Sequence, residues 1–323
     1  MSGGGSAVRA FAPASVSNVA CGFDVLGFAI EGVGDMVTAC RRESAGVVVE
    51  TITGAEGLPL DAARNTAGVA ARALLDAAFP DGGAPGVALT IHKGVPPAGG
   101  LGSSAASAVA AAVAVERLLG LGRDPDRLLD AALAGEASTS GAVHGDNVAP
   151  SLFGGFLLVR VDREPRTVSL PVPEGLTCTL LSPRLTVETS ASRGRIGRTV
   201  PLDVARSHWG NTAALVAGLF RSDRALIASA LEDRLAEPVR HDAVPRYFEV
   251  KDAAIAAGAL GAGLSGSGPA VFALCADPET ARRAGEAMAE AFRPSGTEAV
   301  VRVSAVGAPG ARVIHAGEPS CAP

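Results

Sequence analysis

Apolar residues follow the period of a strand in some segments of this chain and the period of a helix in others. Alternating apolar and polar positions predict strands at 8–12, 35–39, 46–53, 87–92, 152–161, 177–182, 270–275 and 298–303. Recurrence every three to four positions predicts helices at 66–78, 104–119, 125–138, 204–219, 222–231, 247–257 and 278–292. Strands and helices are interleaved in both halves, which indicates an α/β or α+β architecture with two lobes.

A proline-rich segment at 162–174 separates the two halves. Its prolines, at positions 165, 171 and 173, make it the best candidate for a hinge. A chain of 323 residues is long enough for two cores, because single cores stop growing near about 250–300 residues. We therefore expect a flexible tail at 1–6, an N-terminal domain at 7–168 and a C-terminal domain at 169–323.

The loop between a predicted strand and the alanine-rich helix after it carries the clearest chemical signal. Gly99, Gly100 and Gly102 let the backbone bend and approach a ligand with no side chain in the way. Ser103 and Ser104 lie where an N-cap belongs, so we expect their hydroxyls to accept N–H groups of the first turn. Exposed N–H groups and the positive end of the helix dipole predict a phosphate-binding loop. The Lys-Ser/Thr pair that ends a common P-loop does not follow these glycines.

Composition and charge exclude several other classes of protein. The residues are 48% hydrophobic and 19% charged, which is typical of a globular chain. A net charge of −5 with scattered arginines argues against nucleic acid as a partner, and no apolar stretch is long enough to span a membrane. Five widely spaced cysteines and no visible secretory signal fit reduced thiols in a cytoplasmic protein. Only Lys93 and Lys251 of the 28 basic residues are lysines, so almost every cation available to an anion is an arginine.

Two further stretches place polar or flexible residues among apolar ones. The segment 13–27 carries Asn18 and Asp24, which need partners if they are buried. Each of them could also form a structural Asx-turn. The segment 261–273 is rich in glycine and serine, and by itself it could be a plain connecting loop.

Four stretches resemble, in order and spacing, the motifs of the GHMP kinase superfamily and of its homoserine kinase branch. They are 13–27, 96–106, 144–155 (His-Gly-Asp-Asn-Val-Ala-Pro-Ser-Leu-Phe-Gly-Gly) and 263–273, and the resemblance covers residues 8–315. It implies an α+β fold with two lobes, the first like the second domain of ribosomal protein S5 and the second ferredoxin-like. It also implies ATP-dependent phosphorylation of L-homoserine to O-phospho-L-homoserine, on the route to threonine, by a homodimer.

The resemblance assigns the ATP site to one loop and one asparagine. Asn65 matches the position that contacts adenine, although a plain N-cap for the helix at 66–78 is at least as good an interpretation. Mg²⁺ takes few protein ligands, and the matching ones here are Ser104 and Glu136. The loop that would hold the phosphates consists of Pro96, Pro97, Ala98, Gly99, Gly100, Leu101, Gly102, Ser103, Ser104, Ala105 and Ala106.

Homoserine is a zwitterion, so its pocket needs an anion for the ammonium and a cation for the carboxylate. The resemblance places Asp24 at the ammonium, and Arg193 and Arg240 at the carboxylate. Arg195 and Arg198 lie close by in the sequence and could replace Arg193. The other positions that match substrate contacts are Asn18, His144, Asn147 and Thr189.

The catalytic residues implied by the resemblance are Asn147 and Thr189. Asn147 stands where mevalonate-type relatives carry an aspartate, and an amide cannot accept a proton. Asp146 is adjacent, but its side chain would point elsewhere on a strand or a helix. We therefore expect transfer without a dedicated side-chain base, in which Asn147 orients the δ-hydroxyl and the proton leaves to phosphate or water.

Two other functions stay open at this point. The chain could be a GHMP kinase for a different alcohol, although the charges of Asp24 and the arginines disfavour mevalonate-like acids, which carry no ammonium. It could also be a non-catalytic regulator that binds a nucleotide or an amino acid, because a fold alone does not fix a function. Ser104, Glu136 and all the glycine stretches are intact, which favours an enzyme.

Overall fold

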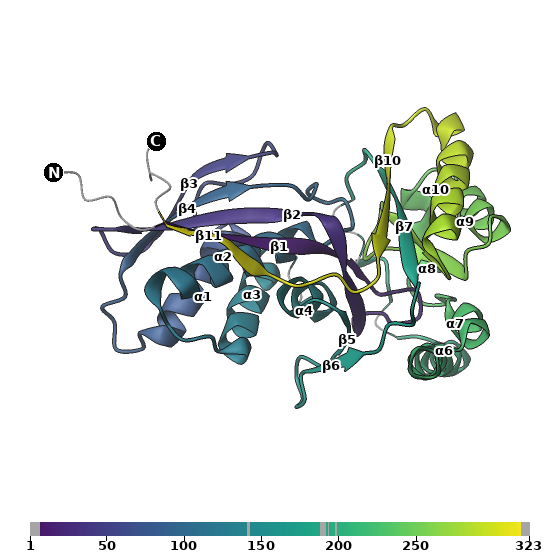
Figure 1. Cartoon of the computed structure of the whole chain (residues 1–323), viewed down its shortest axis with the longest axis horizontal. Helices are drawn as coiled ribbons and strands as arrows, with labels where there is room; N and C mark the ends of the chain where they lie inside the picture. The colour runs from purple at the N-terminus through teal and green to yellow at the C-terminus, as the bar shows by residue number, and fades with distance from the viewer. Residues whose placement is uncertain (1–6, 141–142, 188–191, 193, 198, 318–323) are drawn as a thin grey trace.

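The computed structural model describes residues 7–140, 143–187, 192, 194–197 and 199–317, and it has two lobes (Figure 1). The strands are β1 (Ala7–Ser17), β2 (Leu26–Arg42), β3 (Val47–Thr53), β4 (Gly86–His92), β5 (Phe156–Val159), β6 (Thr167–Leu170), β7 (Thr177–Pro183), β8 (Gly261–Leu264), β9 (Val271–Cys275), β10 (Ala299–Ala305) and β11 (Arg312–Gly317). The α-helices are α1 (Thr66–Ala78), α2 (Ser103–Leu119), α3 (Pro125–Ser140), α4 (Gly145–Phe153), α6 (Leu202–Arg221), α7 (Arg224–Ala230), α8 (Glu237–Arg240), α9 (Tyr247–Ala256) and α10 (Pro278–Phe292).

A seven-stranded sheet forms the first lobe. Its order is β11-β1-β2-β4-β3, and the hairpin of β5 and β6 joins it by pairing with β2. All pairs are antiparallel except β3 with β4, which are parallel and joined through α1. Strand β2 pairs with β4 over residues 36–42 and with β5 over residues 26–28, so it connects the two parts of the sheet.

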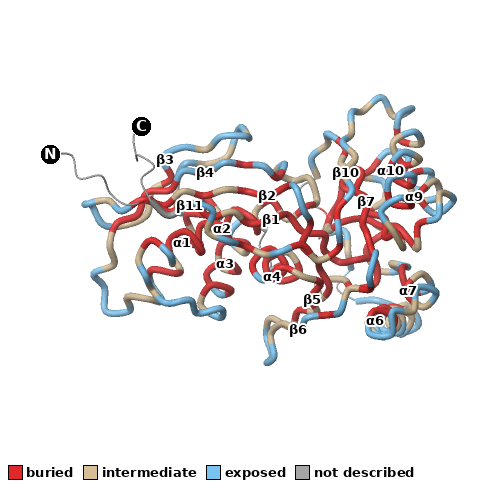
Figure 2. Tube along the Cα trace, viewed as in Figure 1, coloured by how far each residue is buried: buried red, intermediate tan, exposed pale blue. Residues whose placement is uncertain are grey.

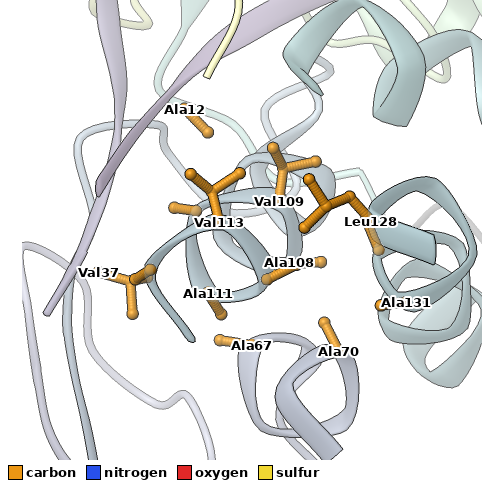
Figure 3. Packing of buried hydrophobic residues seen from close by; sticks show 14 of the residues in the cluster. Ala12, Val37, Ala67, Ala70, Ala108, Val109, Ala111, Val113, Leu128 and Ala131 are labelled. Atoms are coloured by element: carbon orange, nitrogen blue, oxygen red, sulfur yellow. The ribbon is translucent and has the colours of Figure 1, made fainter. Parts of the chain in front are cut away.

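Helix α2 is the centre of the first core. It contacts β1 and β2 on one side and α1 and α3 on the other, and 13 of its 17 residues are buried. Its alanines allow the neighbouring helices to come close, as Ala108 and Ala111 do beside the small residues Ala67 and Ala70 of α1 (Figure 3). On α3, a Cβ added at Gly135 would lie 2.9 Å from the Cβ of Ala108. The alanine-rich sequence is therefore a packing requirement of this lobe.

The second lobe is built on a four-stranded antiparallel sheet. Its order is β10-β7-β9-β8, and α10 packs on β7 and on α9 (Figure 1). The buried residues of α10 include Ala281, Ala284, Met288 and Phe292, which share one face of the helix. Helices α6 and α7 pack against each other beside this sheet (Figure 1).

A second buried cluster joins the two lobes. The rings of Phe28 in β2 and Phe156 in β5 lie 5.4 Å apart, and they share this cluster with Leu180, Leu215 and Phe272 of the second lobe. Buried residues therefore continue without a break through the junction (Figure 2). The two lobes therefore share a core.

The division into domains at 7–168 and 169–323 stays a prediction, and the structure adds one observation to it. Strand β11, from the far end of the chain, pairs with β1, and Gly317 lies opposite Ala7. The first-lobe sheet is therefore completed by residues on both sides of the second lobe in the sequence.

One predicted strand is wrong in its first part. Residues 152–153 end the helix α4, and only Phe156–Val159 form the strand β5. A short apolar run in a buried helix cannot be told from a buried strand by its pattern alone. The α+β fold with two lobes is confirmed.

The cysteines differ from the expectation at one position. Cys21, Cys178 and Cys275 are free and buried, whereas Cys40 is disulfide-bonded. The expectation of uniformly reduced thiols is therefore wrong at Cys40. In the part of the chain that the structure describes, no helix has the length and apolar character needed to cross a membrane.

Candidate active site

A cavity of about 460 Å³ lies at the junction of the lobes, where the glycine-bearing stretches meet. The N–H of Ser15 donates to the carbonyl of Leu101 at 3.2 Å, and the N–H of Gly266 donates to the carbonyl of Ser17 at 3.2 Å. The 13–27 stretch thus holds the phosphate loop on one side and the 261–273 stretch on the other. Stretches far apart in the sequence form one site.

Two glycines of the loop have no room for a side chain. Gly100 has a φ of +78°, and a Cβ there would lie 2.7 Å from the carbonyl oxygen of Gly268. Gly102 has a φ of +67°, and a Cβ there would lie 2.5 Å from the hydroxyl of Ser15 and 2.8 Å from the amide oxygen of Asn147. Both the backbone angles and the close approach of neighbouring chain segments require glycine.

The N-cap expected at Ser103 and Ser104 is wrong. The N-cap of α2 is Gly102 in a left-handed conformation, and no side chain among the described residues caps the helix. The hydroxyl of Ser103 donates instead to the carbonyl of Val95 at 2.8 Å. The first N–H groups of α2 have no intrahelical partner, and Gly102, Ser103 and Ser104 line the cavity, so this helix start suits an anionic ligand.

A buried ion pair that the sequence analysis missed supports this loop from below. The ammonium of Lys93 pairs with the carboxylate of Asp35, and it also donates to the carbonyl of Ser103 and to the hydroxyl of Ser107, both at 2.8 Å. The other oxygen of Asp35 accepts the N–H groups of residues 94 and 95 at 3.0 Å. Burial lowers the pKa of Lys93, against the opposing effect of Asp35. The pair ties both ends of the phosphate loop to β2, and Lys93 also lines the cavity.

Ser104, Glu136 and His144 form a connected group on the cavity wall. The hydroxyl of Ser104 donates to one oxygen of Glu136 at 2.5 Å, and Nδ1 of His144 lies 3.1 Å from the other oxygen. Burial alone would lower the pKa of His144, but the hydrogen bond and charge of Glu136 raise it above its ordinary value. Glu136 and His144 are both buried, so this carboxylate is held in one orientation.

The loop at 18–24 has an unusual backbone. Asn18, Val19, Ala20 and Asp24 all have positive φ, although none is a glycine. The side chain of Asn18 stabilises the loop, because its amide donates to the carbonyl of Gly266 at 3.0 Å and its oxygen accepts the N–H of Asp24 at 3.1 Å. Asn18 and Asp24 both line the cavity.

Arg240 reaches the same cavity from the second lobe. It is 3% exposed, it donates to the carbonyl of Gly266 at 3.2 Å, and its guanidinium lies 5.6 Å from the centre of the Phe23 ring. Arg195, in contrast, is exposed and binds both oxygens of Asp242 at 2.7 and 2.6 Å. The sequence left open that Arg195 replaces Arg193 at the substrate carboxylate, whereas the structure pairs Arg195 with Asp242.

Asn147 and Asp146 are neighbours in the first turn of α4, and both line the cavity. The amide oxygen of Asn147 accepts the hydroxyl of Ser15 at 3.0 Å. One oxygen of Asp146 accepts the N–H of Asn18 at 3.2 Å. Burial and then the charge of Asp24 raise the pKa of Asp146 to about 7.

Asn65 is the N-cap of α1. Its amide oxygen accepts the N–H groups of Ala67 at 3.0 Å and Gly68 at 3.4 Å, and its amide nitrogen donates to the carbonyl of Pro59 at 2.9 Å. The N-cap interpretation is therefore confirmed. Asn65 also lines the cavity, so an adenine contact stays a prediction.

The cavity brings together most of the predicted site residues. Leu101, Ala105 and Ala106 lie in the core, and Pro96 is exposed outside the cavity wall. Thr189, Arg193 and Arg198 lie outside the described residues. The predicted residues on the wall are Asn18, Asp24, Asn65, Pro97, Ala98, Gly99, Gly100, Gly102, Ser103, Ser104, Glu136, His144, Asn147 and Arg240.

Comparison with known proteins identifies the family of this chain. Residues 65–155 match the GHMP kinases N-terminal domain, and residues 215–294 match the GHMP kinases C-terminal domain. A homoserine kinase of Chlorobium phaeobacteroides is 43% identical over 293 residues, which are 88% of this chain and 92% of that protein. The chain belongs to the homoserine kinase family of the GHMP kinases.

Two solved structures show how far the likeness to this family extends. The crystal structure of a homoserine kinase from Cytophaga hutchinsonii is 42% identical, with a TM-score of 0.89 over 95% of this chain and 97% of that one. Mevalonate kinase from L. major, solved with R-mevalonate, has a TM-score of 0.68 at 17% identity over 92% of this chain and 96% of that one. The second likeness concerns the fold alone.

Proposed function

We propose that this protein phosphorylates L-homoserine with ATP to give O-phospho-L-homoserine, a step toward threonine. One observation carries the proposal. A single cavity is lined by the glycine loop with the uncapped start of α2, and also by an aspartate and an arginine whose charges suit an amino-acid zwitterion. The homoserine kinases at about 40% identity support this choice over another alcohol or a regulator.

The loop end would bind the phosphates of ATP. The uncapped start of α2 offers backbone N–H groups, and Gly100 and Gly102 keep the approach open. Lys93 lies under this loop, and its ion pair with Asp35 and its bond to the Ser103 carbonyl hold the loop in place. Such positioning and charge neutralisation are the main demands of phosphoryl transfer.

Ser104 and Glu136 would hold Mg²⁺. They supply a hydroxyl and a carboxylate oxygen in direct contact, and hard oxygen ligands of this kind fit the ion. Among the described residues, no three or more His, Cys, Asp and Glu side chains form a metal cluster, and Mg²⁺ needs few protein ligands when phosphates supply others. The bound ion would supply charge neutralisation on the phosphates. His144 would keep the carboxylate of Glu136 in place.

The other end would bind the amino acid. Asp24 would pair with the ammonium and Arg240 with the carboxylate, together with Arg193 as the family resemblance implies. Asn18 would fix the loop that carries Asp24, because its side chain hydrogen-bonds to Gly266 and to the N–H of Asp24. His144 and Thr189 would complete the substrate contacts.

Asn147 would orient the reacting hydroxyl. Ser15 donates to its amide oxygen, so its amide nitrogen is left to donate to the oxygen of the substrate hydroxyl. The proton of that hydroxyl would then leave to phosphate or water, with no side chain of the protein as its base. Thr189 would be the second catalytic residue, as the family resemblance implies.

The test is ADP release by the purified protein with MgATP and L-homoserine, D-homoserine, L-serine, L-threonine or mevalonate. We expect turnover with L-homoserine at least ~100-fold above the others, because the pocket must match ammonium, carboxylate and hydroxyl together. Selective turnover of another alcohol would refute the substrate and keep the kinase. ATP binding without turnover of any alcohol would favour a regulator.

Three further parts of the proposal rest on the family resemblance: Mg²⁺ dependence, a homodimer and a cytoplasmic location. Omission of Mg²⁺ from the assay tests the first, and sedimentation of the purified protein tests the second. Cell fractionation tests the third. The disulfide at Cys40 makes the third test informative, since disulfides are rare in a reducing cytosol.

A further inference from the structure

Asp146 is a buried carboxyl group that the proposed mechanism does not use. It is 1% exposed, although it contributes to the cavity wall. Its Oδ2 accepts the N–H of Asn18 at 3.2 Å, while its Oδ1 has no hydrogen-bond partner among the described residues. A buried carboxylate oxygen without a donor is unfavourable, so a donor supplied by a ligand would satisfy it.

Asp146 and Asn147 contact different segments of the cavity wall. Asn147 contacts Ser15, and its amide oxygen lies close to Gly102 in the phosphate loop. Asp146 contacts the backbone of Asn18 at the start of the 18–24 loop. Consecutive residues on a helix point about 100° apart, which explains the division. Asn147 therefore lies beside Gly102 of the glycine loop, and Asp146 lies beside the loop that carries Asp24.

The charges around Asp146 favour a cation in this space. The charge of Asp24 raises the pKa of Asp146 after burial, which means that the two carboxyl groups repel each other. Glu136 adds to this repulsion, and His144 is the one described group whose charge opposes it. A cation beside both aspartates would remove the repulsion. An alkylammonium group has three N–H donors and can reach more than one carboxylate.

The geometry points to Asp146 as a second carboxylate for the substrate ammonium, which it holds together with Asp24. This inference rests on the proposed function, because the ammonium is that of L-homoserine. Asp146 is then a specificity-determining residue. It distinguishes amino alcohols from hydroxy acids that have the same chain and no ammonium.

The experiment compares wild-type protein with Asp146→Asn, using L-homoserine as substrate and 4-hydroxybutanoate, which lacks only the ammonium, as its competitor. Asparagine keeps an oxygen for the N–H of Asn18 and removes the charge. We expect KM for L-homoserine to rise roughly 10- to 100-fold, while Ki for 4-hydroxybutanoate and KM for ATP change less than about threefold. Asp130→Asn, an exposed aspartate outside the cavity wall, is the matched control and leaves all three constants unchanged.

Other results overturn the inference in distinguishable ways. An unchanged KM for L-homoserine in the variant excludes the ammonium contact. A loss in kcat of several orders of magnitude with KM unchanged makes Asp146 the base instead. Wild-type protein that does not turn over L-homoserine refutes the proposed function itself. If Asp146→Asn does not fold, Asp146→Ala takes its place. The ratio of KM for L-homoserine to Ki for 4-hydroxybutanoate then shows whether Asp146 contacts the ammonium.

Discussion

The two ends of the cavity are built from different materials. The proposed phosphate end offers the free backbone N–H groups at the start of α2, with a buried ion pair of Lys93 and Asp35 beneath them. The proposed amino-acid end offers charged side chains, Asp24 and Arg240, carried by a loop with positive φ and by a short helix. In the proposed function, backbone groups bind the phosphates, whereas side chains select the amino acid. Changes at either end should therefore separate the constants for ATP from those for the amino acid.

The largest effect should come from Arg240→Met. The variant removes the cation for the substrate carboxylate from a buried position, so we expect kcat/KM for L-homoserine to fall roughly 100- to 1,000-fold. KM for ATP should change less than about threefold. Arg195→Met is the control, because Arg195 is exposed and paired with Asp242, and it should keep near-normal kinetics. Equal losses in kcat/KM for L-homoserine and for ATP would contradict the division of the cavity into a phosphate end and an amino-acid end.

The next effect concerns the phosphate end. Lys93→Met leaves Asp35 buried and unpaired, which should lower the free energy of unfolding by about 3–5 kcal/mol and raise KM for ATP. Adding Asp35→Asn should recover part of the stability, since the amide oxygen can still accept the N–H groups of residues 94 and 95. Chemical denaturation and ATP kinetics measure both. The control is Lys251→Met, which breaks a pair with Glu237 and should leave KM for ATP unchanged. A changed KM for L-homoserine in Lys93→Met would contradict the assignment of Lys93 to the phosphate end.

A smaller effect should appear in the pH dependence of stability. Burial and Asp24 raise the pKa of Asp146 to about 7 in the folded protein, while the unfolded chain ionises near its ordinary value of about 4. The folded state therefore binds the extra proton between those values, and this group lowers stability as pH rises from about 4 to 7. Asp146→Asn should be about as stable as wild type near pH 4 and more stable by up to about 4 kcal/mol at pH 8. Chemical denaturation at both pH values measures the difference in the free energy of unfolding between the variant and wild type. A difference that is the same at both pH values would contradict this prediction.

The smallest effect concerns Asn65 and sharpens its two interpretations. Asn65→Ala removes the N-cap of α1 and should destabilise the protein by about 1 kcal/mol, measured by thermal unfolding. Asn65→Asp keeps a capping oxygen and should restore stability. If KM for ATP rises more than about threefold in Asn65→Asp, the residue also contacts the nucleotide. An unchanged KM leaves it as a cap alone.

Local signals predicted the glycine loop well. Gly100 and Gly102, between a strand and a helix, have positive φ and no room for a Cβ, so both positions require glycine. The serines were predicted only in part. Ser103 and Ser104 lie in the first turn of α2, but their hydroxyls bond to Val95 and Glu136, which lie outside that turn. A rule about local caps could not find those partners.

Long-range partners were beyond the sequence. Lys93 and Asp35 are 58 residues apart, and nothing local marks them as a pair. The one signal in the sequence was indirect. The glycine loop lacks the lysine of a common P-loop, and Lys93, one of only two lysines in the chain, comes just before that loop. The pairing of Asn18 with Gly266 likewise depends on how the lobes meet. The family resemblance supplied site residues, but not the contacts that hold them.

The pairing of β11 with β1 has a consequence for synthesis on the ribosome. The first lobe begins to emerge early, yet one edge of its sheet is filled by a strand translated after the whole second lobe. Until then β1 presents an unpaired edge, the kind of surface that recruits other strands. Nascent chains should gain the resistance of the first lobe to protease only once β11 has left the exit tunnel.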